Sequence, residues 1–303
     1  MRKIWLNRQL LPESEAKVSV YDSAMMFGDT VFEMFRSFNK RHFKLYEHMD
    51  RLVRSAKYLE IPLDFTPLEL CRHYESMVES NRDEFGADDE IRGLVNITRG
   101  ILPLYEPILP LGTNVMMTCF PLRWIIKGAY RWYQRGVPAV IPRQMAVPAR
   151  FLEPKVKNRS RIHYRMADLQ AKKVDPDAWA ILLDDNGFVA EGSGSNFFIV
   201  KDRRLYTPQP RNILRGISRD YVIKLAQNLK IDVFERNIEP YDVYNADEAF
   251  FTCTPYSIMP CTNVDGHLIG TGAPGRYTKR LIHKWSEEVR CSFIDQSRRW
   301  DGA

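Results

Sequence analysis

Cysteine is scarce in this sequence, and no two cysteines stand close together. With five scattered thiols and no CxxC or Cys/His cluster at zinc-like spacing, neither a disulfide framework nor a structural metal is expected. The cysteines are Cys71, Cys119, Cys253, Cys261 and Cys291. We therefore expect a protein without metal in a reducing cytoplasm.

The sequence also lacks a long apolar run. No segment offers the roughly 18 uninterrupted apolar residues that a membrane span needs. The first residues, MRKIWLNRQLLPESEAKVSVYD, carry charge on both sides of each short apolar run, unlike a secretion signal. The sequence predicts a soluble, non-secreted protein that binds no membrane.

A strong charge imbalance is absent as well, since 44 basic residues face 38 acidic ones for a net charge of +6. Such a mild excess is typical of a solvated surface and gives little support for a nucleic-acid-binding protein. The basic residues do gather in one place, however, because residues 155–165 hold two lysines, three arginines and a histidine. This segment is either a patch for a polyanion or the site of a lysine that does covalent chemistry.

What the sequence does have is enough apolar content, 45% of 303 residues, for a sizeable core. Residues 1–122 alternate strand-like and helical patterns and predict a small α+β domain. The expected strands there are 3–11, 30–38, 42–46, 91–100 and 114–122, and the expected helices are 47–61 and 68–82. Residues 123–136 show no clear periodicity and suggest a linker.

Residues 137–303 are richer in strands and predict a larger second domain. The expected strands include 179–185, 187–194, 196–202 and 204–208, with a strand, loop and strand over 248–270; the expected helices are 161–173, 219–230 and 276–289. Asn186-Gly187 favours a tight hairpin. The last dozen residues suggest a loose tail.

Four local patterns could carry chemistry. In EGSGSNFFIV, Glu191 precedes a tight turn whose backbone donors could hold a polar ring or an anion, although a plain hairpin explains the pattern equally well. Gly216, Ile217 and Ser218 fall where a helix should begin, and a helix start attracts phosphate groups. By itself this signal is weak, because every helix has such an end.

The other two patterns involve hydroxyl groups and an arginine. Thr252 and Thr254 could add donors at the end of a strand, although a strand that simply ends at Pro255 is the plainer interpretation. Arg51 lies on the polar side of the expected helix 47–61, where it is either a ligand for an anion or a solvated side chain.

Taken together and in this order, the patterns resemble the fold-type IV pyridoxal 5′-phosphate enzymes, the class IV aminotransferases. The resemblance covers about residues 3 to 285 and is closest to branched-chain-amino-acid aminotransferases. It rests on FGDTVFEMFRSF, FKLYEHMDRLVRSAKYL, VKNRSRIHY, AILLDDNGFVAEGSGSNFFIV, LYTP…ILRGISRD and DEAFFTCTPYSIMPCTNVDG. It implies two domains, a small N-terminal α/β sandwich and a larger C-terminal domain with a mixed, barrel-like β core.

The resemblance also implies roles for single residues. Lys157 would form the internal Schiff base with pyridoxal 5′-phosphate, since it lies 34 positions before Glu191, near the spacing usual in this family. An arginine also follows it at the fourth position, as in the related aminodeoxychorismate lyases. Nearby cations such as Arg159 and Arg161, if they point inward, would favour the neutral amine that this chemistry needs. Glu191 would pair with the pyridine nitrogen. The remaining cofactor contacts that the resemblance implies are Arg51, Tyr164, Gly216, Ile217, Ser218 and Thr254.

For the substrate, Arg92 and Arg36 match arginines of branched-chain enzymes, and either could receive a carboxylate. Phe32, Thr254 and Pro255 complete the substrate contacts that the resemblance implies. The sequence departs from the pattern at Glu90, where a tyrosine is usual, and at Phe27 and Met34, where tyrosine and glycine are usual. Leu104 stands where D-amino-acid aminotransferases carry their carboxylate-binding arginine.

The first hypothesis is therefore a cytoplasmic transaminase that moves an amino group between an L-amino acid, branched-chain or otherwise hydrophobic, and 2-oxoglutarate or another 2-oxo acid. Alternatives with the same cofactor are an (R)-amine or D-amino-acid transaminase and an aminodeoxychorismate-lyase-like enzyme. A nucleic-acid-binding protein is the alternative outside enzymes. The family further implies a homodimer in which residues near Phe27 reach the partner's active site; ordinary core packing of Met25, Met26 and Phe27 is the alternative.

Overall fold

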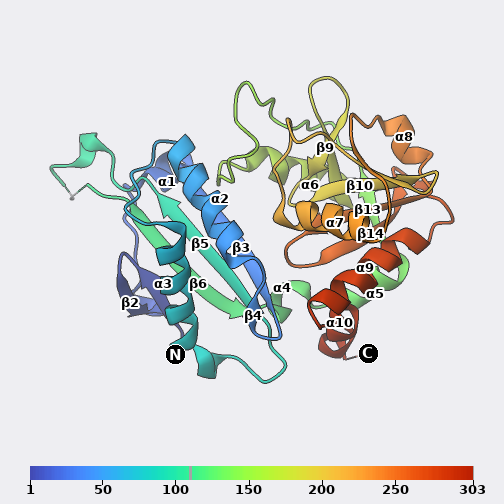
Figure 1. The fold of residues 1–303 in the computed structure, drawn as a ribbon. Helices are drawn as coiled ribbons and strands as arrows, with labels where there is room; N and C mark the ends of the chain where they lie inside the picture. Colours follow the sequence, from blue (N-terminus) through green and yellow to red (C-terminus); the bar gives the residue numbers. More distant parts are fainter. Residues whose placement is uncertain (109–110, 303) are drawn as a thin grey trace. The chain divides into compact units, whose positions relative to one another are not determined.

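The computed structural model describes residues 1–108 and 111–302, which form two compact units (Figure 1). Unit 1 comprises Met1–Trp124 together with the short segment Val156–Ser160, and unit 2 comprises Ile125–Lys155 and residues 161–302. Residues 123–136, which the sequence suggested as a linker, contain two short helices, α4 (Arg123–Ile126) and α5 (Tyr130–Arg135).

Unit 1 is built on an antiparallel sheet with the strand order β2-β1-β6-β5-β3-β4. Its strands are β1 (Lys3–Leu6), β2 (Gln9–Pro12), β3 (Thr30–Phe38), β4 (Arg41–His42), β5 (Ile91–Thr98) and β6 (Asn114–Pro121). β3 and β5 pair over seven positions, from Thr30 opposite Thr98 to Arg36 opposite Arg92. This register fixes which side chains of the two strands lie beside each other.

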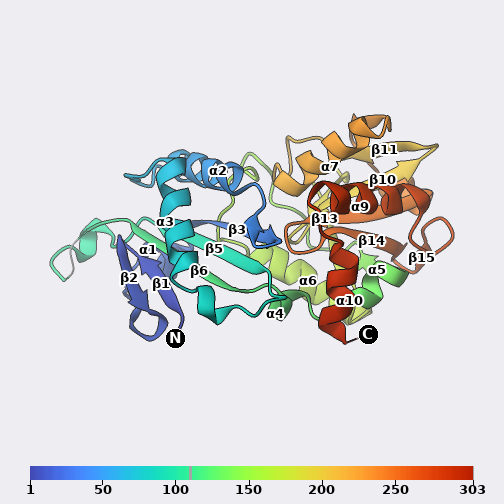
Figure 2. The same cartoon turned by 60° about the horizontal axis from the view of Figure 1, so that its bottom comes forward.

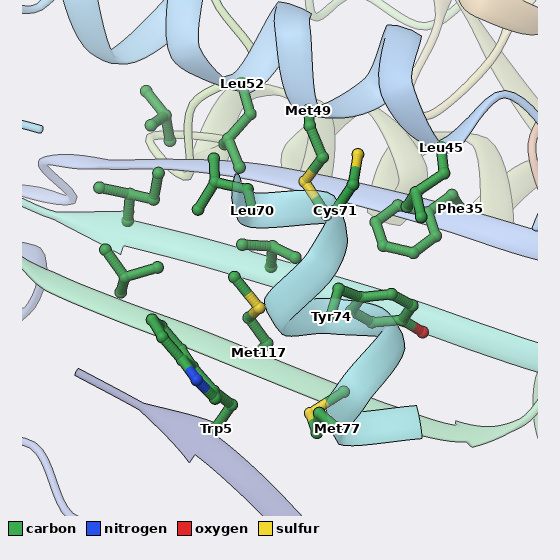
Figure 3. Close-up of a cluster of buried hydrophobic side chains, with 14 of the residues drawn as sticks. Trp5, Phe35, Leu45, Met49, Leu52, Leu70, Cys71, Tyr74, Met77 and Met117 are labelled. Carbon is green, nitrogen blue, oxygen red and sulfur yellow. The ribbon is translucent and has the colours of Figure 1, made fainter. Parts of the chain in front are cut away.

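Two helices pack on this sheet, α2 (Leu45–Tyr58) against β3 and α3 (Pro67–Glu79) against β1 and β6 (Figure 1). Their apolar sides meet the sheet in one buried cluster that includes Met49 and Leu52 of α2, and Tyr74 of α3 lies against Phe35 of β3 with ring centroids 4.6 Å apart (Figure 3). α3 begins at Pro67 behind a capping box formed by Thr66 and Glu69. The shorter helical elements are α1 (Ser23–Phe27), η1 (Glu13–Glu15), η2 (Arg82–Glu84) and η3 (Pro103–Tyr105).

The strand expected over 42–46 is wrong. Only Arg41–His42 pairs with β3, because Lys44 adopts a left-handed backbone conformation (φ 56°) and Leu45 then begins α2. The alternation in HFKLY is therefore a strand end followed by a helix start, and a pattern of five residues could not separate the two.

Unit 2 is built on a mixed sheet with the strand order β12-β11-β10-β13-β14-β7-β8-β9, and β15 pairs with β14. The strands are β7 (Val137–Val140), β8 (Trp179–Leu183), β9 (Val189–Gly192), β10 (Asn196–Lys201), β11 (Arg204–Thr207), β12 (Val233–Glu235), β13 (Glu248–Cys253), β14 (Ser257–Val264) and β15 (His267–Leu268). β7 runs parallel to both β14 and β8, and β11 runs parallel to β12. Because β9 at the end of the sheet also packs against β10, the sheet curls towards a half barrel.

Helices surround this curled sheet (Figure 2): α6 packs on β7 and β8, whereas α7 and α9 pack together over β13 and β14. The helices of unit 2 after α5 are α6 (Ile162–Val174), α7 (Ile217–Asn228), α8 (Pro240–Tyr244), α9 (Arg276–Glu288) and α10 (Phe293–Asp301). In the described residues, no helix combines the length and the apolar character needed to cross a membrane.

The expected loose tail is also wrong, because the chain closes with α10. Ser292 caps this helix by accepting a hydrogen bond from the Asp295 backbone N–H. Phe293 is buried, with its ring centroid 5.9 Å from that of Tyr133 and 6.3 Å from that of Trp285. Packing of one aromatic ring thus stabilises a helix whose remaining sequence is mostly polar.

Candidate active site

Lys157 lies on the segment Val156–Ser160, which runs antiparallel to the first half of β3. The Phe32 N–H donates to the Lys157 carbonyl oxygen at 2.9 Å, and the Arg159 N–H donates to the Thr30 carbonyl oxygen at 2.8 Å. A β-bridge joins Val31 and Asn158 between these two bonds. The backbone on both sides of Asn158, including that of the lysine, is therefore held against β3.

The Lys157 side chain lies beside the ring of Phe32, with Nζ 4.9 Å from the ring centroid. The Arg159 guanidinium lies over the same ring, 3.7 Å from its centroid, and donates two hydrogen bonds to Asn96 Oδ1 at 3.1 and 3.0 Å. The structure thus brings Lys157, Phe32 and Arg159 together on one aromatic surface. Arg161 belongs to unit 2.

Arg51 pairs with a buried carboxylate, Glu33 of β3. Arg51 Nε donates to Glu33 Oε1 at 2.6 Å and Arg51 Nη2 donates to Glu33 Oε2 at 2.9 Å, while His48 Nδ1 lies 2.6 Å from Glu33 Oε2. Burial raises the pKa of Glu33, but Arg51 and His48 outweigh it and hold this pKa well below its usual range. Burial also lowers the pKa of His48. Arg51 is thus neither solvated nor isolated, and a helix pattern alone could not reveal its partner on a strand.

Arg36 and Arg92 stand directly opposite each other in the register of β3 and β5, so their side chains leave the same face of the sheet. Both are buried, at 1% and 4% exposed. Arg36 Nε donates to the Ser37 carbonyl oxygen at 3.0 Å, and its guanidinium lies 4.0 Å from the centroid of the Phe38 ring. Like charges placed opposite each other destabilise a sheet unless negative groups compensate them.

Glu90, which stands where a tyrosine is usual, closes the turn between β3 and β4. Its carboxylate accepts hydrogen bonds from the Ser37 hydroxyl, from the Asn39 N–H at 2.7 Å and from the Lys40 N–H at 3.1 Å. These contacts fix the end of β3 next to Arg36. The glutamate at position 90 therefore stabilises this turn.

In unit 2, Glu191 at the end of β9 is 5% exposed and accepts hydrogen bonds from Tyr164, Asn196 and Leu214. Tyr164 Oη donates to Oε1 at 2.6 Å, while Asn196 Nδ2 and the Leu214 N–H donate to Oε2 at 3.1 and 3.0 Å. Burial, together with Glu191, raises the pKa of Tyr164 well above its usual value, so this phenol is a neutral donor. Arg161 lies over the Tyr164 ring at 4.2 Å and donates to the Ser193 carbonyl oxygen.

α7 begins where the sequence predicts, with Gly216 as N-cap and Ile217 and Ser218 as its first residues. No side chain caps this end of the helix. The Asn196 amide that holds Glu191 also donates to the Leu214 carbonyl oxygen at 2.9 Å, and a Cβ at Gly216 would lie 2.0 Å from Asn196 Oδ1. Glycine is therefore required for this close approach, and the uncapped helix start offers backbone donors and a favourable dipole to an anion such as phosphate.

Thr254 and Pro255 lie in the connection between β13 and β14, where Tyr133 Oη anchors the loop by donating to the Tyr256 carbonyl oxygen at 2.7 Å. Just before this loop, Thr252 Oγ1 is buried and has no hydrogen-bond partner among the described residues. Thr252 pairs with Asn196 across β13 and β10, so both side chains lie on one face of the sheet. A buried hydroxyl of this kind, on the same face of the sheet as the Asn196 side chain that donates to Glu191, suits a polar cofactor. Pro255 has no N–H and can contact a ligand only through its ring or its carbonyl oxygen.

Three residues of these networks were missed by the sequence reasoning: Glu33, His48 and Asn196. Glu33 is a lone acid in the otherwise apolar run TVFEMF, and His48 lies one helical turn before Arg51, so a charge in a buried strand was the available signal. Asn196 belongs to the quoted EGSGSN motif but was given no role. In residues 1–108 and 111–302, no three His, Cys, Asp or Glu side chains gather closely enough to hold a metal ion.

The family model described as amino-transferase class IV matches residues 30–264 of this chain. The chain therefore belongs to the class IV aminotransferases, as the sequence predicts.

Several relatives of this class are similar over nearly their whole length. The putative branched-chain-amino-acid aminotransferase of Methanocaldococcus jannaschii is 37% identical over 94% of this chain and 96% of that protein. The D-alanine aminotransferase of Bacillus licheniformis is 32% identical over 92% of this chain and 94% of that protein. The branched-chain amino acid aminotransferase of Thermobaculum terrenum, solved in its PLP form, has a TM-score of 0.81 at 26% identity and covers 99% of this chain and 96% of that one. The predicted α+β fold with two domains and a barrel-like core is confirmed.

Proposed function

We propose that this aminotransferase uses pyridoxal 5′-phosphate to move an amino group between a branched-chain or otherwise hydrophobic L-amino acid and 2-oxoglutarate or another 2-oxo acid. The observation that carries the proposal is the pair of buried arginines, Arg36 and Arg92, directly opposite each other on β3 and β5. A 2-oxo acid with a second carboxylate requires such a cation, whereas a hydrophobic amino acid requires apolar surface such as the Phe32 ring.

The residues present fit this cofactor. The N–H groups at the start of α7, from Ile217 and Ser218, would hold its phosphate together with Arg51 and Thr254. Glu191 would hold the pyridine nitrogen in its protonated form, and Tyr164 and Asn196 would keep that carboxylate in place. When bound, the cofactor supplies an electron sink for the substrate α-carbon.

Lys157 would carry the cofactor covalently and move protons. Its Nζ would accept the proton that leaves the α-carbon of the amino donor, and would later return a proton to the α-carbon of the amino acid formed from the 2-oxo acid. The backbone bonds of Lys157 to β3 support this role, because a base must return to the same position in every turnover.

The test of this role compares two lysines of one segment. Lys157→Ala should abolish the absorbance of the Schiff base between protein and cofactor and lower turnover by roughly a thousandfold or more. Lys155→Ala is the matched control, since Lys155 pairs with Glu153, and its turnover should stay within about twofold. If Lys157→Ala keeps covalent cofactor or full turnover, the assignment of the lysine is wrong.

A panel of single L- and D-amino acids with 2-oxoglutarate, followed by chiral analysis of the products, tests the substrate. Turnover of L-leucine, L-isoleucine or L-valine is expected. A response to D-amino acids alone would instead favour the second candidate, a D-amino-acid transaminase, which the similarity with the Bacillus licheniformis enzyme supports. Leu104 in place of an arginine argues against that candidate.

We further propose a cytoplasmic homodimer. Met25 and Phe27 of α1 are 73% and 68% exposed in the single chain, which is unusual for large apolar side chains and suits a surface covered by a second copy. Light scattering coupled to size-exclusion chromatography should give twice the mass of the chain, and a monomer at micromolar concentration would contradict this assignment.

A further inference from the structure

Glu33 is a fully buried carboxylate in the middle of a hydrophobic strand. Its side chain is 0% exposed, and its neighbours along β3 are Phe32 and Met34. Removing a carboxylate from water is costly unless charged partners and hydrogen bonds compensate it. The fold must therefore supply those partners, and all that the structure shows come from α2.

The partners are His48 and Arg51, three positions apart and hence on one face of α2. Arg51 presents its Nε and Nη2 edge to the two carboxylate oxygens, and His48 Nδ1 lies against Oε2. This side-on, bidentate contact fixes the plane of the guanidinium, because two parallel hydrogen bonds define both its direction and its rotation.

The exposure of the three side chains shows which of them reaches the surface. Glu33 is 0% and His48 2% exposed, whereas Arg51 is 14% exposed. The charge of the group is thus compensated in the interior, and the arginine is the member that reaches the surface of unit 1. A buried ion pair is weak evidence for a role in stability, because apolar residues of similar volume often serve as well.

We propose that Glu33 is a positioning residue, supported by His48, which fixes the guanidinium of Arg51 for contact with the phosphate of the cofactor. This inference rests on the proposed function, in which Arg51 is a phosphate ligand. Glu33 would not touch the cofactor, but it would set the preference of the protein for a phosphorylated ligand.

The test measures dissociation constants of pyridoxal 5′-phosphate and of pyridoxal, which lacks the phosphate, on the full-length protein after removal of its cofactor. Glu33→Gln should raise the constant for the phosphorylated ligand roughly tenfold or more and leave the constant for pyridoxal within about twofold. Arg51→Gln should do the same, and the double variant should add nothing to Arg51→Gln, since both act on one contact.

Two further variants keep the test decisive. Glu79→Gln removes a carboxylate that is 72% exposed and paired with Arg82 in the same unit, and it should change neither constant. If Glu33→Gln does not fold, His48→Gln takes its place, with a smaller loss that is again confined to the phosphorylated ligand. Circular dichroism checks that each variant is folded.

Three results would overturn the inference. An equal loss for both ligands in Glu33→Gln, or in His48→Gln where that replaces it, would mean that the group is merely structural. An additive loss in the double variant would mean that Glu33 acts without Arg51. If Arg51→Gln leaves the preference for the phosphorylated ligand unchanged, the role of Arg51 itself is wrong; if the unmodified protein does not bind pyridoxal 5′-phosphate, the proposed function fails first.

Discussion

Replacing Asn196 by alanine removes the amide that joins Glu191 to the chain just before α7. Its Nδ2 donates to Glu191 Oε2 at 3.1 Å and to the Leu214 carbonyl oxygen at 2.9 Å, and the residue is 4% exposed. A hydrogen bond to a charged group contributes about 1.5–3 kcal/mol and a neutral one about 0.5–1.5 kcal/mol, so the expected loss is about 2–4 kcal/mol. Since about 1 kcal/mol shifts the unfolding midpoint by roughly 3 °C in a domain of this size, the midpoint should fall by about 6–12 °C.

Asn196→Asp sharpens this prediction because it keeps the shape and removes the donor. A carboxylate about 3.1 Å from Glu191 Oε2 would add a repulsion of order 5 kcal/mol at an effective dielectric constant near 20. At pH 8 the aspartate variant should therefore be less stable than the alanine variant. As the pH falls to 5, one of the two carboxyl groups takes up a proton more readily in the folded state than in the unfolded state, and the aspartate variant should recover stability.

Thermal unfolding followed by circular dichroism at pH 8 and pH 5 measures these differences. Asn186→Ala, an exposed asparagine in the turn before β9, is the control and should shift the midpoint by less than about 2 °C. The reasoning is refuted if Asn196→Asp is as stable as Asn196→Ala at pH 8, or if their difference does not shrink at pH 5.

Three further changes have outcomes that follow from contacts in the structure. Glu248 accepts hydrogen bonds from the Thr278 N–H at 2.7 Å and hydroxyl at 2.8 Å at the start of α9, so Glu248→Ala should cost about 3 kcal/mol in chemical denaturation, and a loss below about 1 kcal/mol would contradict this capping role. Tyr164→Phe removes the 2.6 Å hydrogen bond to Glu191 and should weaken cofactor binding roughly tenfold in a spectroscopic titration; unchanged binding would mean that the phenol does not support the carboxylate. Burial lowers the pKa of His42 from 6.5 to about 4, so between these pH values the unfolded state binds a proton that the folded state does not. The free energy of unfolding should therefore fall by about 2 kcal/mol as the pH drops from 7 to 5. His42→Gln should largely remove this fall.

The elements that position the candidate site could be predicted from local patterns. The helix over EHMDRLVRSAKYL was predicted because Leu52 and Ala56 repeat on one face, and both are buried in α2. The start of α7 was predicted because glycine precedes a periodic run, and the helix does begin at Ile217. Such features depend on residues that are close together in the sequence, so a single sequence is enough to predict them.

Features that depend on partners far away in sequence could not be predicted in this way. Helical periodicity assigned Arg51 to a polar face, but Glu33, 18 positions earlier on a strand, draws it into a buried contact. α10 was missed because its stability comes from packing of Phe293 on Trp285, whereas its own sequence is mostly polar. The class of enzyme was still predictable, because a family resemblance reflects how motifs far apart in the sequence occur together, and periodicity does not.

The return of Val156–Ser160 to unit 1 limits how the chain can be divided. The backbone passes from one unit to the other at Trp124, at Lys155 and again at Ser160, so a cut after residue 124 does not yield two self-contained pieces. A fragment 1–124 would expose the edge of β3 that now receives residues 157 and 159, and a fragment 125–303 would carry Lys157 on a loop without its strand partner. Split-protein designs and domain exchanges with relatives should therefore transfer residues 156–160 together with β3, because the reactive amine obtains its fixed position from a strand encoded more than a hundred residues earlier.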